Sequence, residues 1–210
     1  MNDTTNQSLR YDSTGADTLG DNEKHSLQTY VSDLLALEQH IGKPLDGQLA
    51  SDATKQYAQA LTVIQSIKTQ NDAHQAALKQ CLDSLGGHPA GPIKSAWSSL
   101  LGGAAAAIGA ARKTKVTKWL RDDYTALSLA SMSYTLLHAT AVGLGDTATA
   151  SVAKQGLADY ARAVMQINQV IPEVVLGELR EDGETVQTGA AETIRQATNE
   201  VWKSQSSVTN

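Results

Sequence analysis

Residues 115–180 read KVTKWLRDDYTALSLASMSYTLLHATAVGLGDTATASVAKQGLADYARAVMQINQVIPEVVLGELR and contain two helical patterns in succession. In each half, apolar side chains recur every three or four residues, as one face of an α-helix requires. The first face skips one position, at Asp123. The two faces consist of Val116, Leu120, Leu127, Ala130, Tyr134, Leu137 and Ala141, and of Leu157, Tyr160, Val164, Ile167, Ile171 and Val174. Gly143 and Gly145 end the first pattern, and the short connection to Thr147 predicts an antiparallel helical hairpin.

Two further helical patterns lie upstream and supply partners for this hairpin. The first runs from about Lys24 to Gly42, with Pro44 to Gly47 expected to end it. Its predicted core residues are Leu27, Tyr30, Leu34, Leu37 and Ile41. The second runs from about Asp52 to Leu85, and two polar residues one helical turn apart, Asn71 and His74, interrupt its apolar face. Buried polar groups without partners are costly, so both residues are expected to have hydrogen-bond partners.

The composition predicts an all-α protein in a reducing cytoplasmic setting. The 210 residues include 4 prolines and no phenylalanine, and the net charge of −5 argues against a general nucleic-acid binder. Nothing at the N-terminus resembles a signal peptide, and Ser95–Ala111 is too short and too weakly apolar for a membrane span. The single cysteine, Cys81, cannot form an internal disulfide and is expected to be a buried, inert thiol.

Changes in composition divide the chain into three parts. Residues 1–22 are polar and without periodicity, which predicts a disordered tail, or alternatively a binding arm. Residues 23–180 are expected to form a four-helix bundle, with a Gly/Ala-rich crossover at about 86–114 that lies flat on the bundle or in a subunit contact. Residues 184–205 predict a C-terminal helix that packs on the bundle or on a second subunit, or is partly ordered.

Three segments carry a resemblance to a known family. They are LLALE at 34–38, YTLLHATAVGLGD at 134–146 and VIPEVVLGEL at 170–179. Together with the long crossover, they resemble the ferritin-like superfamily, and within it the YciE/YciF-type bacterial stress-protein family. The resemblance implies a four-helix bundle with a carboxylate-bridged di-iron centre, in which Glu and His side chains from all four helices face inward.

The metal ligands implied by the resemblance are only partly present. Glu38 matches the first-helix ligand, and His74 stands where the second helix is expected to supply a carboxylate. The third-helix positions hold Leu127 and Ala130, which cannot bind metal. The fourth-helix positions hold Asp159 and Tyr160. Glu38, His74 and Asp159 could therefore hold one metal ion, iron being the expected one, but they do not make a di-iron site.

Several roles remain open for these residues. His74 is a neutral core histidine bonded to Asn71 or Glu38, a metal ligand, or a proton carrier. Glu38 is a ligand or a carboxylate at the solvent edge. The tyrosines 124, 134 and 160 are core residues with bonded hydroxyl groups, or relay electrons to a metal.

Three functions follow from these alternatives. The first is a ferritin-like stress protein that has lost catalysis and acts through oligomerisation or partner binding, with a two-fold dimer as the expected assembly and the crossover and terminal extensions as contact surfaces. The second is an iron-dependent oxidase or peroxide-consuming enzyme that uses Glu38, His74 and Asp159. The third is a bundle that binds a small ligand where carboxylates are missing.

Overall fold

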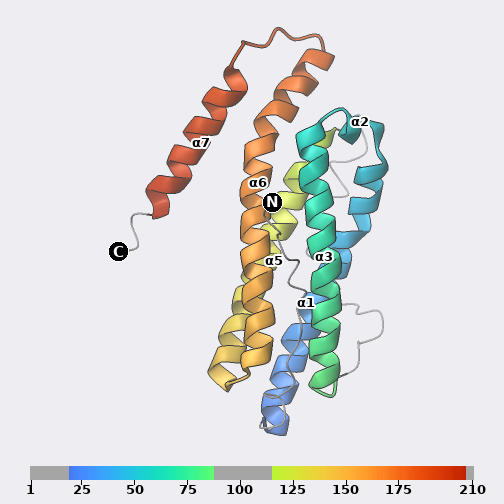
Figure 1. The fold of residues 1–210 in the computed structure, drawn as a ribbon, viewed down its shortest axis with the longest axis vertical. Coiled ribbons are helices and arrows are strands. Elements are labelled where there is room, and N and C mark those ends of the chain that lie inside the picture. The colour runs from blue at the N-terminus through green and yellow to red at the C-terminus, as the bar shows by residue number, and fades with distance from the viewer. Residues whose placement is uncertain (1–18, 88–114, 207–210) are drawn as a thin grey trace, which may run out of the picture.

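The computed structural model describes residues 19–87 and 115–206, and every regular element in these two ranges is an α-helix (Figure 1). The all-α class predicted from the sequence is therefore confirmed for the described residues. The helices are α1 (Asp21–Ala50), α2 (Asp52–Lys55), α3 (Ala58–Ser84), α5 (Val116–Leu144), α6 (Thr147–Glu181) and α7 (Ala190–Ser206).

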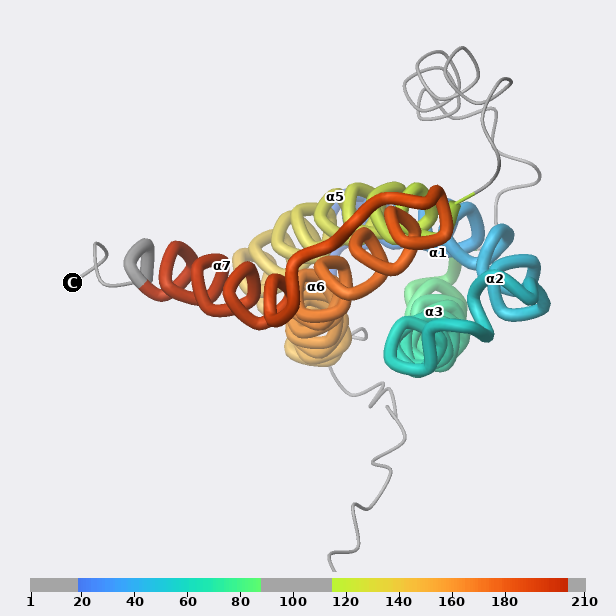
Figure 2. Tube along the Cα trace, turned by 90° about the horizontal axis from the view of Figure 1, so that it is seen from above, coloured from blue at the N-terminus to red at the C-terminus, as the bar shows by residue number. Residues whose placement is uncertain are grey.

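The long helices α1, α3, α5 and α6 run side by side around one core. Viewed from above, α1 and α5 lie on one side and α3 and α6 on the other (Figure 2). Each of the four packs against two of the others, since α1 contacts α3 and α5 while α6 contacts the same two helices. All seven residues of the apolar face predicted for α5 are buried, and so is Asp123, which the pattern skipped.

Helices α5 and α6 form the predicted hairpin. Gly145 ends α5 in the left-handed conformation, at a φ of 78°, which a residue without a Cβ adopts at little cost. Asp146 then begins α6, because its side chain accepts hydrogen bonds from the backbone N–H groups of Ala148 and Thr149, each at 3.1 Å. This turn fixes the two helices antiparallel.

Helix α3 ends and α5 begins at opposite ends of the molecule (Figure 1). Residues 88–114 connect these two ends and lie outside the described residues, so the predicted crossover helix cannot be compared with the structure. The same holds for residues 1–18 of the predicted tail.

The first helix is longer than predicted. It was expected to end near Gly42, but α1 continues through Pro44 to Ala50. Leu45 and Gln48 are both buried beyond the proline, and the side-chain amide of Gln48 donates to Asp123 Oδ1 at 3.0 Å. Burial of this last segment outweighs the backbone hydrogen bond that the proline removes.

The start of α1 also differs from the prediction. Asp21 and Asn22, which were assigned to the tail, are helical. The carboxylate of Glu23 accepts a hydrogen bond from the backbone N–H of Gly20 at 2.6 Å, which stabilises an earlier first turn. On the same helix, Tyr30 was expected in the core and is instead exposed.

The second helix is broken near its start. The short α2 ends at Lys55, and α3 begins at Ala58, because the chain turns at Tyr57 to place its ring against α6. A Cβ on Gly177 of α6 would lie 2.5 Å from that ring, so the glycine is what allows the contact. The Tyr57 hydroxyl donates to Glu181 Oε1 at 2.7 Å.

The C-terminal helix begins later than predicted, at Ala190 instead of Glu184, after the left-handed Gly183 and Gly189. Its contacts with α6 are polar. Gln169 Nε2 donates to Asn199 Oδ1 at 2.6 Å, and Arg195 lies 3.6 Å from a carboxylate oxygen of Glu173. The apolar residues Ile194 and Val201 are partly exposed.

Candidate functional site: a buried polar network

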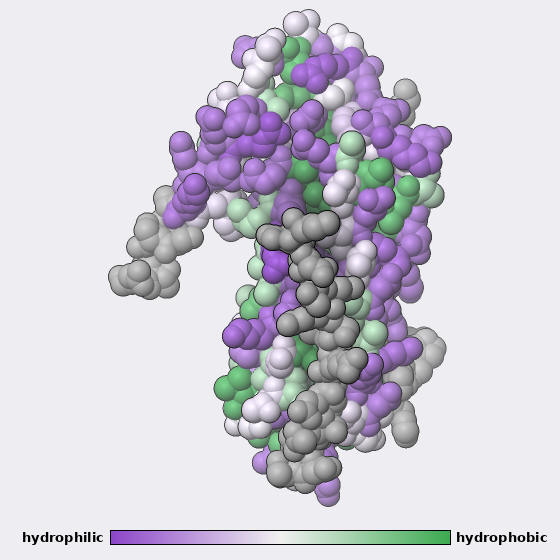
Figure 3. All heavy atoms as spheres, in the orientation of Figure 1, coloured by the Kyte–Doolittle hydropathy of each residue, from purple (hydrophilic) through white to green (hydrophobic). Residues whose placement is uncertain are grey.

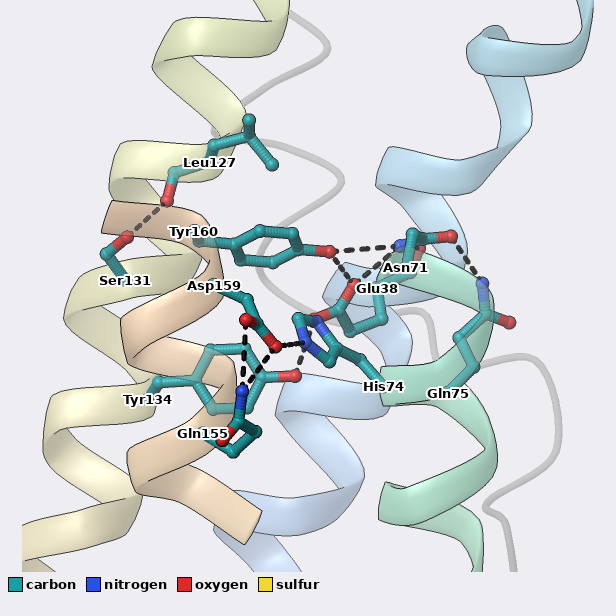
Figure 4. A network of polar contacts seen from close by, with 10 residues as sticks. All are labelled: Glu38, Asn71, His74, Gln75, Leu127, Ser131, Tyr134, Gln155, Asp159 and Tyr160. Atoms are coloured by element: carbon teal, nitrogen blue, oxygen red, sulfur yellow. Dashed lines mark hydrogen bonds and ion pairs between the residues drawn. The ribbon is translucent and has the colours of Figure 1, made fainter. Parts of the chain in front are cut away.

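A cluster of polar side chains lies midway along the four long helices, at a single level of the core (Figure 4). Each helix contributes from the face that it turns inward. Glu38 comes from α1, Asn71 and His74 from α3, Tyr134 from α5, and Asp159 with Tyr160 from α6. We call these six residues the central network.

Glu38 is at the centre of the network and is fully buried. Its Oε1 accepts hydrogen bonds from the Tyr134 hydroxyl at 2.6 Å and from His74 Nδ1 at 3.2 Å. Its Oε2 accepts from Asn71 Nδ2 at 2.5 Å and from the Tyr160 hydroxyl. A buried carboxylate requires such compensation, and here four protein donors from three helices supply it.

Asn71 ties α3 to the backbone of α1 as well as to this carboxylate. Its Nδ2 donates to the Glu38 carbonyl oxygen at 2.8 Å. The close approach depends on Gly42, where a Cβ would lie 2.5 Å from Asn71 Oδ1. The expectation that Asn71 has buried partners is confirmed.

His74 lies between two carboxylates. Its Nδ1 is 3.2 Å from Glu38 Oε1, and its Nε2 is 3.2 Å from Asp159 Oδ2. Burial alone would lower the pKa of His74, but the hydrogen bonds and charges of Asp159 and Glu38 outweigh it and raise the pKa to about 9. The raised pKa favours a protonated ring at neutral pH, in which both nitrogens are donors. The bond to Glu38, one of the alternatives predicted for a core histidine, is confirmed.

Asp159 forms the outer end of the network and is 13% exposed. Gln155 Nε2 lies 3.0 Å from each of its carboxylate oxygens, and the exposed Arg162 reaches Oδ1 at 3.4 Å. Although burial raises the pKa of Asp159, the bonds from His74 and Gln155 and the nearby positive charges lower it below its ordinary value. The network thus connects the protein surface to the buried tyrosines.

Tyr134 and Tyr160 close the inner end of the network. Their rings meet that of His74 edge to face, with centroids 5.4 Å and 4.7 Å away. Burial, followed by the charge of Glu38, raises the pKa of both hydroxyl groups far above the ordinary value. Both side chains are consequently protonated donors, which agrees with the interpretation of these tyrosines as core residues with bonded hydroxyl groups.

We expect Gly156→Ala to destabilise the protein, because a Cβ at this position of α6 would lie 2.4 Å from the ring of Tyr134. Overpacking of this kind costs about 1–3 kcal/mol, which chemical denaturation would measure. Gly47→Ala is the matched control, since nothing lies within 4 Å of its Cβ position and alanine favours the helix by about 0.5–1 kcal/mol. Equal effects of the two substitutions would contradict the tight contact.

Two other buried groups lie apart from the network. Asp123 accepts a hydrogen bond from Gln48 at 3.0 Å, as expected for a polar residue on an apolar face, and burial raises its pKa to about 6. Cys81 is fully buried with its sulfur 3.1 Å from Thr149 Oγ1, and burial raises the pKa of the thiol to about 12. The prediction of a buried, inert thiol is confirmed, because a thiol with so high a pKa is rarely ionised.

The three residues proposed as metal ligands are brought together, but not around a common point. Glu38 and Asp159 lie at opposite nitrogens of the His74 ring, so an ion bound to one nitrogen would reach only one of the two carboxylates in this arrangement. Within residues 19–87 and 115–206, no group of three or more His, Cys, Asp and Glu side chains is placed to hold a metal ion. Leu127 and Ala130 supply no ligand from α5. These donors do not fit the di-iron centre that the resemblance implies.

The sequence located three members of the network as candidate site residues and Asn71 as a buried polar residue. It did not identify Tyr134 and Tyr160 as the partners of Glu38, although both lie on the predicted inward faces near the middle of their helices. Comparison of the chain with protein-family models, curated proteins and solved structures found no match.

Proposed function

We propose that the chain is a ferritin-like four-helix bundle in which the central network occupies the place of a di-iron centre, and that it works as a non-catalytic cytoplasmic stress protein through assembly or partner binding. The observation that carries the proposal is the state of the Glu38 carboxylate, whose two oxygens accept four hydrogen bonds from the protein. A metal ligand needs free lone pairs directed at the ion, and the lone pairs of the Glu38 carboxylate already accept hydrogen bonds from side chains in the core.

The chain topology supports the fold proposed here. Two antiparallel helix pairs, α1 with α3 and α5 with α6, are joined by a connection that spans the length of the molecule (Figure 1). One long crossover of this kind is the arrangement typical of ferritin-like bundles. Helix α7 is an addition to that plan.

The burial of the network supports a structural role instead of a catalytic one. Glu38 and His74 are almost completely shielded from solvent, so no substrate reaches them without movement of the helices. A cavity of about 300 Å³ opens between the start of α3 and α6, but its lining residues include no member of the network. A fully satisfied buried polar network fixes the register of the helices that it joins, which is the function assigned to it here.

The metal content of the protein tests this proposal. Protein produced with excess iron and purified without chelator should contain only trace iron, and added Fe²⁺ should leave its melting temperature unchanged, because a ligand stabilises only the state that binds it. Glu38→Gln protein prepared in parallel is the control for adventitious binding. About one or two irons per chain, lost in that variant, would contradict the proposal and support the iron-dependent oxidase that uses Glu38, His74 and Asp159.

A further inference from the structure

From Thr125 onward, the side of α5 that faces away from the core carries no charge. Between Tyr124 and Gly145 the sequence contains no Asp, Glu, Lys or Arg, and its one histidine, His138, bonds to the carbonyl oxygen of Ala150. The α5 outward face, as we define it, consists of the exposed residues Thr125, Ser128, Met132, Leu136, Ala139 and Gly143, with the half-buried Leu129 and Thr140 along one edge. Met132 is 59% exposed and Leu136 49% exposed, so large apolar side chains stand in solvent at its centre.

The other long helices differ from α5 in this respect. Their exposed positions hold charged residues along the helix, for example Asp33 on α1, Asp72 on α3 and Lys154 on α6. The visible side of the molecule over α3, α6 and α7 is largely hydrophilic, with hydrophobic atoms in small separate groups (Figure 3). Surface helices of soluble proteins normally present a polar face to water, so the α5 outward face has the character of a covered surface.

Covering this face would cost its hydroxyl groups few hydrogen bonds, because they already donate within the helix. Thr125 donates to the carbonyl oxygen of Arg121 at 3.0 Å, Ser128 to that of Tyr124 at 2.8 Å, and Thr140 to that of Leu136 at 2.9 Å. Each hydroxyl is therefore satisfied within its own helix. Burying the face leaves no unpaired polar group and no unpaired charge, which are the usual costs of forming a dry contact.

We infer that the α5 outward face is the two-fold contact between two copies of this chain. In a two-fold contact the same surface meets itself, so a charge near the axis faces a charge of its own sign. A face without charges avoids that repulsion along its whole length. With the helices antiparallel across the axis, Met132 of one copy meets Leu136 of the other, and the small residues Ala139 and Gly143 allow the helices to approach closely.

The dimensions of the face fit the centre of such an interface. At about 1.5 Å per residue, the helix from Thr125 to Gly143 is roughly 27 Å long. The surface area of one helix face of this length is smaller than the roughly 800 Å² of surface that each partner buries in a standard interface. Exposed polar residues of the neighbouring α1 and α6 would complete the interface as its rim, around an apolar centre on α5.

A membrane is the other surface that α5 could meet. In the part of the chain that the structure describes, α5 is the one helix long and apolar enough to cross a bilayer, judged by length and composition. Its inward face, however, carries the buried Asp123 and the Tyr134 hydroxyl bonded to Glu38, and packs against α1 and α6. Such a helix cannot also be surrounded by lipid, and its outward face lacks the basic residues that bind anionic headgroups.

Paired charge substitutions test the contact. Sedimentation of the full chain at micromolar concentration should give twice the 22.2 kDa mass of one chain. Met132→Glu with Leu136→Glu, and separately Met132→Lys with Leu136→Lys, should each give a helical monomer, because like charges then meet across the axis. A mixture of the two variants should recover the dimer mass. Thr69→Glu, at an exposed position of α3 and outside the proposed interface, is the control and should remain dimeric.

Each other outcome overturns the inference. A monomeric wild-type chain, a dimer that persists in both charged variants, or a mixture that stays monomeric would exclude the two-fold contact on α5. Binding of a monomeric chain to vesicles of mixed neutral and anionic phospholipid, abolished in the charged variants, would assign the face to a membrane instead. The two-fold contact rests on the proposed function, in which the chain acts through assembly. The two can fail separately, because iron content tests the role of Glu38 whereas the sedimentation mass tests the contact on α5.

Discussion

Glu38→Ala is expected to lower the free energy of unfolding by roughly 3–5 kcal/mol, the range found when one partner of a buried charge pair is removed. The substitution leaves the hydroxyl groups of Tyr134 and Tyr160 without their carboxylate acceptor and His74 with one carboxylate instead of two, while Asn71 keeps its hydrogen bond to the backbone carbonyl of residue 38. It also leaves a void at the level where all four long helices meet. Since whole domains are stable by only about 5–15 kcal/mol, the variant should be close to unfolding at physiological temperature.

Urea denaturation monitored by circular dichroism would measure this effect. Asp33→Ala is the matched control, since it removes an exposed carboxylate from the same helix and should change stability by no more than about 0.5 kcal/mol. Glu38→Gln should be intermediate, because the amide oxygen still accepts hydrogen bonds while the amide nitrogen meets the donor Asn71. A loss below about 1 kcal/mol for Glu38→Ala would show that the carboxylate is not the centre of the network.

The inward face of α5 was predictable because its signal is local. The α6 face was predicted in part, since Tyr160, Ile167 and Val174 are buried while Leu157, Val164 and Ile171 are only half-buried. An apolar residue every three or four positions indicates a helix face independently of the rest of the chain. The glycine pair beside Asp146 indicates the turn. The same reasoning placed Asn71 and His74 on a buried face and required partners for them. It left Glu38 open between a metal ligand and a carboxylate at the solvent edge, and the structure buries Glu38 completely. Periodicity assigns a residue to a face, but it does not say which side chain of another helix stands opposite.

The errors at helix ends have a different cause. Pro44 locally favours the end of a helix. The helix continues because Leu45 and Gln48 beyond it are buried and Gln48 bonds to Asp123 of α5, a contact that the neighbouring sequence does not indicate. Tyr57 breaks the second helix because Gly177, far along the chain, leaves room for its ring. In each case a contact between distant segments decided the outcome over local propensity.

The environment of His74 likewise depends on a contact between distant segments. Near Glu38 alone, a neutral histidine sharing one hydrogen bond is a reasonable expectation for a buried ring. Asp159 lies on another helix, and its position at the second ring nitrogen is what favours the protonated form. The sequence pattern places His74 on an inward face, and the family resemblance singles out Glu38 and Asp159, while the order Glu38, His74, Asp159 in space emerges only when α1, α3 and α6 are packed together.

The stability of the protein is expected to fall as the pH rises from about 6.5 to 9, by an amount of the order of 3 kcal/mol. The pKa of His74 is near 6.5 in the unfolded chain and about 9 in the folded protein, so within this window the folded state binds more protons than the unfolded state. Raising the pH therefore favours unfolding. Below pH 6.5 protonated His74 makes its full contribution to the stability of the folded state, and above about pH 9 this contribution is lost.

The pH range in which stability falls distinguishes His74 from the other groups whose pKa is shifted. Asp123, with a pKa raised to about 6, makes stability fall between about pH 4 and 6, and Cys81, with a pKa of about 12, acts above pH 9. The groups that face His74 directly are Glu38, Asp159, Tyr134 and Tyr160, and Arg162 faces it through Asp159. Both tyrosines stay protonated far beyond this range, so the slope between pH 6.5 and 9 belongs to the histidine held between its carboxylates.

Urea denaturation at half-unit steps of pH would measure the slope, and His74→Gln supplies the control because glutamine does not titrate. The variant should be less stable at pH 6 and should lose the decline between pH 6.5 and 9. Nitrogen chemical shifts of the ring should show both nitrogens protonated at pH 7. An unchanged slope in His74→Gln would place the titrating group elsewhere. A neutral ring at pH 7 would mean that desolvation outweighs the two carboxylates, and the network would then hold two carboxylates beside an uncharged ring, with only the exposed Arg162 near Asp159.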